Sequence, residues 1–131
     1  MKPVDTMTRR EVNEFLAEHL FGYERFEQED ECHQPETIWG SVRGNPAYCE
    51  YDFHDVDFHL NWQKVVERLY KKTQVLGHSV EFVGLDECVW EASVTDIEER
   101  GYYGIKSHGK TMGDAICRVV VEFLRFKEVY Q

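Results

Sequence analysis

Apolar residues recur along this chain at two periods, one typical of helices and one typical of strands. Near the start they follow one face of a helix. A capping box precedes this face, because the Thr8 hydroxyl and the Glu11 carboxylate can each accept a hydrogen bond from the other's exposed backbone amide. Gly22 suits the left-handed turn that often ends a helix. The pattern predicts a first helix over residues 8–20. Its apolar face comprises Val12, Phe15, Leu16, His19 and Leu20.

A second and broader apolar stripe at the helical period predicts a helix over residues 56–73. Asp55 or Asp57 can cap its start. The stripe comprises Phe58, Trp62, Val65, Val66, Leu69 and Tyr70. A last helix is predicted over residues 111–126, where an apolar face outweighs the modest helix propensity of β-branched residues. Its expected core positions are Ala115, Ile116, Val119, Val120, Phe123 and Leu124.

Three stretches between these two helices alternate apolar and polar side chains, which is typical of half-buried strands. They cover residues 79–83, 88–96 and 102–106. Residues 84–87 suit a hairpin turn between the first two. We expect the third strand to return antiparallel to the second.

From residue 27 to residue 52 the apolar pattern fails, and turn-forming residues recur. We predict a long acidic loop here, or a short hairpin through residues 37–43, because a structureless connection of this length is unusual in a compact domain. Trp39 is costly to leave in water, so we expect it to pack on the body or to form part of a binding surface. The complete prediction is an α+β fold, a single domain over residues 1–131. A small antiparallel sheet of about three strands is covered by helices, in the order helix, loop, helix, three strands, helix.

The composition narrows the class of protein. At 131 residues, of which 42% are hydrophobic, the chain is long enough for one core. It has no apolar run of membrane-spanning length and no apolar stretch typical of a signal peptide near its start. We therefore expect a cytoplasmic protein that does not bind membranes. The four cysteines include no C-x-x-C pair, and we expect Cys88 and Cys117 to be small core residues.

The formal net charge of −10 is concentrated in one segment. Residues 24–57 contain ten acidic and two basic side chains. A field of this sign repels phosphate backbones, so we expect no direct nucleic-acid binding. The acidic segment instead suits a cationic partner, a divalent metal, or solubility alone. The predicted interaction surface consists of Glu27, Glu29, Asp30, Glu31 and Trp39.

The sharpest functional motif is Gly-Ile-Lys-Ser-His-Gly-Lys-Thr over residues 104–111, which matches the phosphate-loop pattern G-x-x-x-x-G-K-[ST]. A true phosphate loop follows the first strand of a parallel sheet and needs a later strand that delivers an aspartate. Here the residues after 111 predict one helix and a tail. The alternatives are anion binding by exposed amides at the helix start, or a plain strand-to-helix turn in which Ser107 or Thr111 is the cap. The candidate anion-binding residues are Gly104, Lys106, His108, Gly109, Lys110 and Thr111.

A second candidate is a metal site at Asp55 and His59, which are four residues apart and would share a helix face. Carboxylate and imidazole together suit zinc, manganese or iron. The segment lacks a tight metal motif such as H-E-x-x-H, and helix capping by the aspartates explains the same residues. No nucleophile motif is present. We therefore predict no catalytic residues and no cofactor.

Three stretches have the motifs of one known family. Residues 7–18 resemble its first helix. Residues 57–62 resemble its aspartate-to-tryptophan entry to the second helix, and residues 109–117, from Gly-Lys-Thr to Ala-Ile-Cys, resemble the start of its last. In these motifs the chain resembles the phage ABA-sandwich domain family of small phage and prophage proteins. The resemblance implies a three-layer sandwich of helices and sheet and a phage origin. With a phage origin, the cytoplasm expected above is that of the host cell. It implies no established activity and no catalytic residues.

Together these observations favour a non-enzymatic phage or prophage accessory protein that binds a host or phage protein through its acidic surface. This function predicts salt-dependent binding. One alternative is a small-molecule, nucleotide or phosphate-binding protein, or a hydrolase, that uses residues 104–111. It predicts that nucleotides raise the melting temperature and that Lys110→Ala removes the effect. Another alternative is a structural or assembly component, which predicts a stable homo-oligomer.

Overall fold

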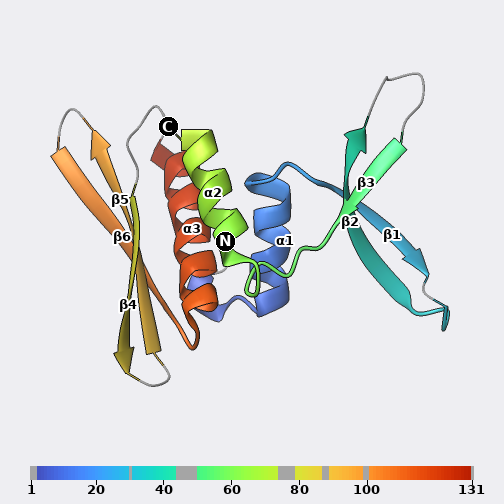
Figure 1. Cartoon of the computed structure of the whole chain (residues 1–131), viewed down its shortest axis with the longest axis horizontal. Helices are drawn as coiled ribbons and strands as arrows, with labels where there is room; N and C mark the ends of the chain where they lie inside the picture. Colours follow the sequence, from blue (N-terminus) through green and yellow to red (C-terminus); the bar gives the residue numbers. More distant parts are fainter. Residues whose placement is uncertain are drawn as a thin grey trace.

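In the computed structural model, the described part of the chain forms an α+β fold of three layers, with helices between two antiparallel sheets (Figure 1). The structure describes residues 3–29, 31–43, 50–73, 79–86, 89–98 and 101–130. The helices are the short 3₁₀ helix η1 (Val4–Thr6), α1 (Arg9–His19), α2 (Trp62–Thr73) and α3 (Met112–Tyr130). The first sheet contains β1 (Glu24–Glu29), β2 (Pro35–Arg43) and β3 (Glu50–His54) in that order. The second contains β4 (Ser79–Asp86), β5 (Val89–Glu98) and β6 (Gly101–Gly109).

Helix α1 agrees closely with the sequence prediction. The Thr8 hydroxyl accepts a hydrogen bond from the Glu11 amide at 3.2 Å, and the Glu11 carboxylate accepts one from the Thr8 amide at 3.2 Å. Gly22 has a φ of 69°, a left-handed conformation that glycine adopts without steric cost. The predicted capping box and the predicted glycine turn are both confirmed.

Helix α3 is the central element of the core. It packs against β5 and β6 on one side and against α1 and α2 on others. All its predicted core positions are buried, and so are Cys117 and Val121. Burial on several sides explains why this helix forms despite its β-branched residues, because tertiary packing outweighs intrinsic propensity.

The second sheet confirms the three predicted strands, each of which extends further than predicted. β5 pairs antiparallel with β4 and with β6. Ala92 and Val94 on β5 are fully buried, and Trp90 packs against the same core. The apolar residues of this alternating stretch therefore face the core, as a half-buried strand requires.

The predicted loop over residues 27–52 is wrong, because most of this segment forms the first sheet. In that sheet Trp39 on β2 lies opposite Arg25 on β1 and opposite His54 on β3. The alternative, a short hairpin through residues 37–43, correctly placed strand structure there, but these residues all belong to the single strand β2, which pairs with β1 and β3. The strand signal was weak because β1 has one partly buried residue, Phe26, while its others are exposed. Backbone ladders form without apolar alternation, so a mostly exposed strand has no two-residue period.

Helix α2 begins at Trp62, which is later than predicted. The residues before it instead form a turn that buries Phe58 and His59. The Asp55 carboxylate accepts a hydrogen bond from the Asp57 amide at 2.9 Å. Such local side-chain bonds compete with the helical ladder. Burial of the Phe58 ring favours the turn further.

The structure also tests the predictions that Trp39 and Cys117 pack in the core. Trp39 is 4% exposed and belongs to the core, so its interpretation as a packing residue is confirmed. Cys117 is buried, as predicted, whereas Cys88 lies outside the described residues. Among the described helices, none combines the length and the apolar character that a membrane span needs.

Candidate functional site

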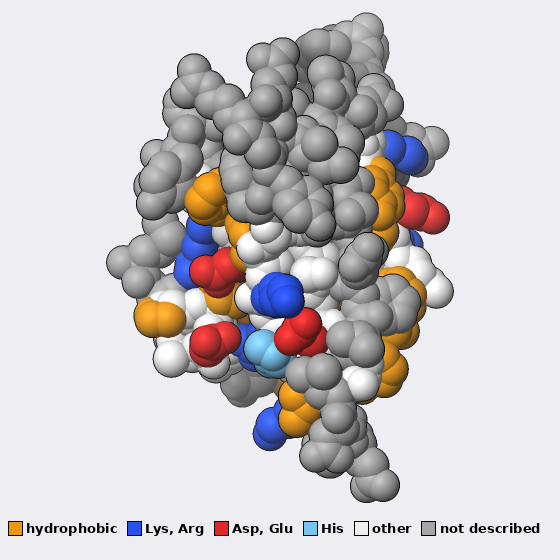
Figure 2. Space-filling view, turned by 90° about the vertical axis from the view of Figure 1, so that its left-hand side faces the viewer, with side chains coloured by type: hydrophobic (Ala, Val, Ile, Leu, Met, Phe, Trp, Pro, Cys, Tyr) orange, Lys and Arg blue, Asp and Glu red, His pale blue; other side chains and the backbone are white. Residues whose placement is uncertain are grey.

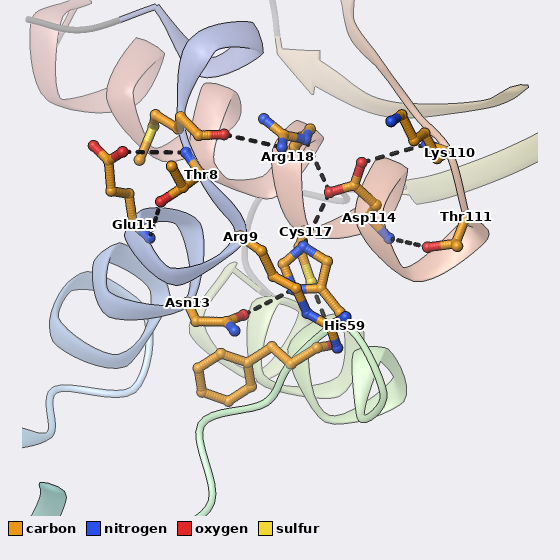
Figure 3. Close-up of polar contacts among 12 residues, drawn as sticks. Thr8, Arg9, Glu11, Asn13, His59, Lys110, Thr111, Asp114, Cys117 and Arg118 are labelled. Atoms are coloured by element: carbon orange, nitrogen blue, oxygen red, sulfur yellow. Dashed lines mark hydrogen bonds and ion pairs between the residues drawn. The ribbon is translucent and has the colours of Figure 1, made fainter. Parts of the chain in front are cut away.

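A polar network lies inside the core where α1, α3 and the turn before α2 meet (Figure 3). At its centre is His59, whose side chain is 5% exposed. Its Nδ1 lies 2.9 Å from Asn13 Oδ1 on α1, and its Nε2 lies 3.0 Å from Asp114 Oδ1 on α3. Both ring nitrogens therefore have partners, as buried polar groups generally do.

Asp114 extends this network to the N-terminal segment through Arg118. The Arg118 Nε donates to Asp114 Oδ1 at 2.9 Å, and its terminal nitrogens donate to the carbonyl oxygens of Val4 at 2.6 Å and Met7 at 3.0 Å. Burial raises the pKa of Asp114, but the hydrogen bonds from His59 and Arg118 and the nearby Arg118 charge together lower that pKa below its ordinary value. The carboxylate is therefore ionised at neutral pH and connects segments that are far apart in sequence.

Asn13, the residue on the other side of the His59 ring from Asp114, limits the chemistry that this network can perform. A histidine held by a carboxylate can activate a hydroxyl or thiol nucleophile on its other nitrogen. In this protein the other nitrogen faces the amide oxygen of Asn13, which is not a nucleophile that a base can activate. The arrangement is suited to holding the helices together.

The Cys117 thiol lies at the same junction and donates to the Phe58 carbonyl oxygen at 3.3 Å. Burial raises the pKa of Cys117 well above its ordinary value, and the Asp114 carboxylate adds to the increase. The thiol therefore stays protonated at neutral pH. A protonated thiol is a poor nucleophile.

We expect Cys117 to resist alkylation in the folded protein, whereas the exposed Cys32 reacts. The measurement treats the native protein with iodoacetamide at mildly alkaline pH and identifies the modified peptides by mass spectrometry. The same reaction in concentrated urea is the control and should modify both residues. Modification of Cys117 as fast as Cys32 under native conditions would contradict its burial.

The phosphate-loop motif lies largely in a strand. The stretch from Gly104 to Gly109 belongs to β6, which pairs antiparallel with β5, so its backbone is extended and does not wrap around a phosphate. Lys106 Nζ lies 3.8 Å from Glu91 Oε1, and His108 Nε2 lies 3.1 Å from Glu91 Oε2. Figure 2 looks onto this side of the molecule and shows basic, acidic and histidine side chains interleaved on its described part. The positive charge of the motif is therefore partly balanced by the neighbouring strand.

The end of the motif is the start of α3, where Asp114 lies. Thr111 Oγ1 accepts a hydrogen bond from the Asp114 amide at 3.1 Å, so Thr111 acts as the cap of a strand-to-helix turn. Asp114 Oδ2 lies 3.4 Å from the Lys110 amide nitrogen. A Cβ at Gly109 would lie 2.5 Å from the Ala115 amide nitrogen, so this glycine permits close packing of the strand on the helix. The chain's own carboxylate thus occupies the side of the helix start where an anion would bind.

The two residues of the predicted metal pair do not converge. Asp55 is exposed, whereas the His59 ring is buried and bonded to Asn13 and Asp114. The late start of α2 is the cause, because the pair no longer shares a helix face. Within the described ranges, no three potential metal ligands lie close enough together to hold an ion.

A groove of about 520 Å³ lies between α1, β2 and the segment before α2, and we call it the α1–β2 groove. Its lining comprises Arg9, Arg10, Asn13, Glu14, Thr37, Trp39, Asp55, Val56 and Asp57. Arg9 pairs with Asp57 at 2.6 Å, and Arg10 pairs with Glu14 at 3.0 Å. Asn13 joins the groove to the buried network, because its side chain also contacts the His59 ring.

The predicted interaction residues lie partly along this groove. Trp39 is part of the lining. Glu27 on β1 pairs with Thr37 on β2, which lines the groove. Glu29 lies on the same face of the sheet as Glu27, because alternate residues of a strand share a face. Glu31 is exposed in the turn after β1, and Asp30 lies outside the described residues.

The residues that α1 contributes to the groove were not identified from the sequence. Arg9, Arg10, Asn13 and Glu14 all lie in the predicted first helix. The available signal was the spacing of Arg10 and Glu14, which favours an ion pair on the helix surface. Their role in a groove depends on β2, and this strand was assigned to a loop.

No protein-family model matches the chain, and no curated protein matches it significantly. The resemblance to the phage family therefore stays a prediction.

Proposed function

We propose that this is a non-enzymatic interaction protein that binds a basic segment of a partner protein in the α1–β2 groove. The observation that carries this proposal is an exposed carboxylate, Asp55, in a groove of about 520 Å³ that also contains Trp39. Binding pockets commonly have volumes of this order and combine apolar walls with a few polar groups. The family resemblance implies that the partner is a host or phage protein.

The charges in the groove favour a cationic ligand. Each arginine of the lining already has an acidic partner, Asp57 for Arg9 and Glu14 for Arg10. Asp55 is the remaining charged residue of the lining. Its Oδ1 accepts a hydrogen bond from the Asp57 backbone amide. A backbone amide is neutral, so the negative charge of Asp55 is available to a lysine or arginine of a partner.

Acidic side chains continue beyond the groove. Glu27 and Glu29 lie on the same face of the first sheet as Trp39. The whole chain has a formal net charge of −10. Complementary potentials increase the association rate and select against like-charged partners. Exposed ion pairs contribute little to stability, so the pairs of Arg9 and Arg10 can rearrange around a ligand at small cost.

Two reactive side chains of the described region support a non-enzymatic role. His59 and Cys117 are both buried, and both are hydrogen-bonded within the core. The α1–β2 groove is separated from the His59 ring by Asn13. A ligand in the groove would therefore meet Asp55 and the ion-paired arginines, which suit recognition.

We expect Asp55→Lys to weaken binding of a basic peptide about tenfold, or about 1.4 kcal/mol, because it reverses the charge that faces the ligand. The probe is a fluorescein-labelled peptide of alternating arginine and glycine, and the measurement is fluorescence anisotropy. Binding by the unchanged protein should weaken as the salt concentration rises, since exposed charges are screened.

Asp5→Lys is the matched control. Asp5 is also exposed, lies outside the groove lining and gives the same change in net charge. It should reduce affinity much less than Asp55→Lys. Equal losses for the two variants would show diffuse attraction to an acidic protein and would contradict a site in the groove, as would failure of the unchanged protein to bind the peptide.

A further inference from the structure

A second hollow, of about 280 Å³, lies between α2 and the segment that follows α1, and we call it the α2 pocket. Its lining comprises Phe21, Tyr23, Lys64, Glu67, Arg68 and Lys71. The three basic residues are spaced four and three apart on α2, so they lie on one side of the helix. They outnumber the single acidic residue, although the whole chain has a net charge of −10. The pocket thus differs in charge from the α1–β2 groove.

Arg68 has a defined orientation in this pocket. Its Nε donates to the Leu20 carbonyl oxygen near the end of α1 at 3.3 Å. This bond leaves the terminal nitrogens of the guanidinium as donors for a ligand. A guanidinium fixed by one bond loses little further freedom when its other nitrogens bind phosphate oxygens.

Tyr23 forms a rigid wall beside Arg68. Its ring stacks with Phe21 at a centroid distance of 5.2 Å and with His54 at 4.2 Å. Burial raises the pKa of Tyr23, and the positive charge of Arg68 opposes this increase. The hydroxyl therefore stays protonated at neutral pH, as a potential donor near the guanidinium.

The two lysines of the pocket are available to a ligand. Lys64 and Lys71 are both exposed. Within the described part of the chain neither has an ion-pair partner. The basic residues of the phosphate-loop motif differ in this respect, since Lys106 and His108 lie beside Glu91.

We infer that the α2 pocket binds the phosphate group of a small organic phosphate. Arg68, Lys64 and Lys71 contact the phosphate oxygens, and the aromatic wall of Phe21 and Tyr23 contacts the attached carbon group. Apolar walls with convergent charged groups are typical of pockets that take such ligands. This site is independent of the α1–β2 groove and of the function proposed for it.

The test uses phenyl phosphate as the probe and follows amide chemical shifts in a titration of the full chain. The double variant Lys64→Gln/Lys71→Gln should weaken binding at least tenfold, because two of three cations are lost. Both lysines are exposed, so the variant should fold, and its melting curve verifies this. The matched control is Lys106→Gln/Lys110→Gln, which removes the same charge from the phosphate-loop motif and should leave the affinity unchanged.

Two further probes distinguish the contribution of the basic residues from that of the aromatic wall. Inorganic phosphate should bind more weakly than phenyl phosphate, and phenol should not bind at the same concentrations. Equal affinity for the two phosphates would overturn the contact with the aromatic wall. The inference as a whole is overturned if the Lys106/Lys110 variant loses binding and the Lys64/Lys71 variant keeps it, or if the unchanged protein does not bind phenyl phosphate at 10 mM.

Discussion

Replacing Asp114 with alanine is expected to lower the free energy of unfolding by about 3 kcal/mol, because it leaves two buried charged or polar groups without their common acceptor. These groups are His59 Nε2 and Arg118 Nε, at 3.0 and 2.9 Å from Asp114 Oδ1. Their side chains are 5% and 14% exposed, so water has little access to replace the carboxylate. Urea denaturation at pH 7 measures the loss. In a chain of this length it corresponds to a fall in melting temperature of roughly 10 °C.

The control for this prediction is Glu18→Ala, which removes an exposed carboxylate from α1. It should change the free energy of unfolding by less than about 0.5 kcal/mol. Asp114→Asn keeps an oxygen acceptor and should lose less stability than Asp114→Ala. If Asp114→Ala were as stable as Glu18→Ala, the network would not contribute to the stability of the fold.

The pH dependence of the same variants tests the electrostatic part of this account. The pKa of Asp114 in the folded protein lies below the ordinary value of 3.8. In the pH range between these two pKa values the unfolded chain binds the additional proton, so acid favours unfolding. The contribution of the ionised carboxylate is complete above pH 3.8 and is lost as the pH falls through the folded pKa. The stability difference between the unchanged protein and Asp114→Asn should therefore be constant near neutral pH and shrink in acid.

Replacing Gly113 with alanine is expected to destabilise the protein by about 2 kcal/mol, even though alanine is the better helix former. In a helix interior the change would stabilise by about 1 kcal/mol. At this position, however, the added Cβ would overlap the backbone carbonyl oxygen of His59. A backbone atom in a buried turn cannot move aside as the end of a flexible side chain can. Displacing the turn would also lengthen the bond between His59 and Asp114.

Gly84→Ala is the matched control for this substitution. A Cβ on Gly84 would lie 3.6 Å from the Trp90 ring, which is an ordinary van der Waals contact. Its stability should be equal to that of the unchanged protein or slightly higher. Thermal unfolding of Gly113→Ala, Gly84→Ala and the unchanged protein measures these stabilities. A Gly113→Ala protein that is more stable than the unchanged one would show that helix propensity, and not the close approach of α3 to the turn, controls this position.

Local features of the fold were predictable because their causes lie within a few residues. The capping box of Thr8 and Glu11 and the left-handed turn at Gly22 depend on neighbours in sequence, and both are present. The core face of α3 and the strands β4, β5 and β6 follow from periodic apolar residues that each element must bury on one side. The start of α2 was placed too early. The preceding turn also buries an aromatic ring, that of Phe58, and this residue fits the helical period of the apolar residues in α2.

The candidate sites depended on contacts between distant segments. The α1–β2 groove joins Arg9 to Asp55 and Trp39, and no local pattern relates residues so far apart. The α2 pocket likewise needs Tyr23 beside Arg68.

By itself, the sequence determined the three helices, the second sheet and the acidic character of residues 24–57, because propensity, periodicity and charge are properties of single residues and close neighbours. The tertiary structure decided the first sheet, whose exposed strands pair through backbone hydrogen bonds and leave little trace in the side-chain pattern. It also decided the environment of residues 104–111. The motif resembles a phosphate loop, but Asp114 and Glu91 lie beside its cations and amides in the folded chain. Electrostatic interactions fall off with distance in space, so the fold and not the motif determines where an anion can bind.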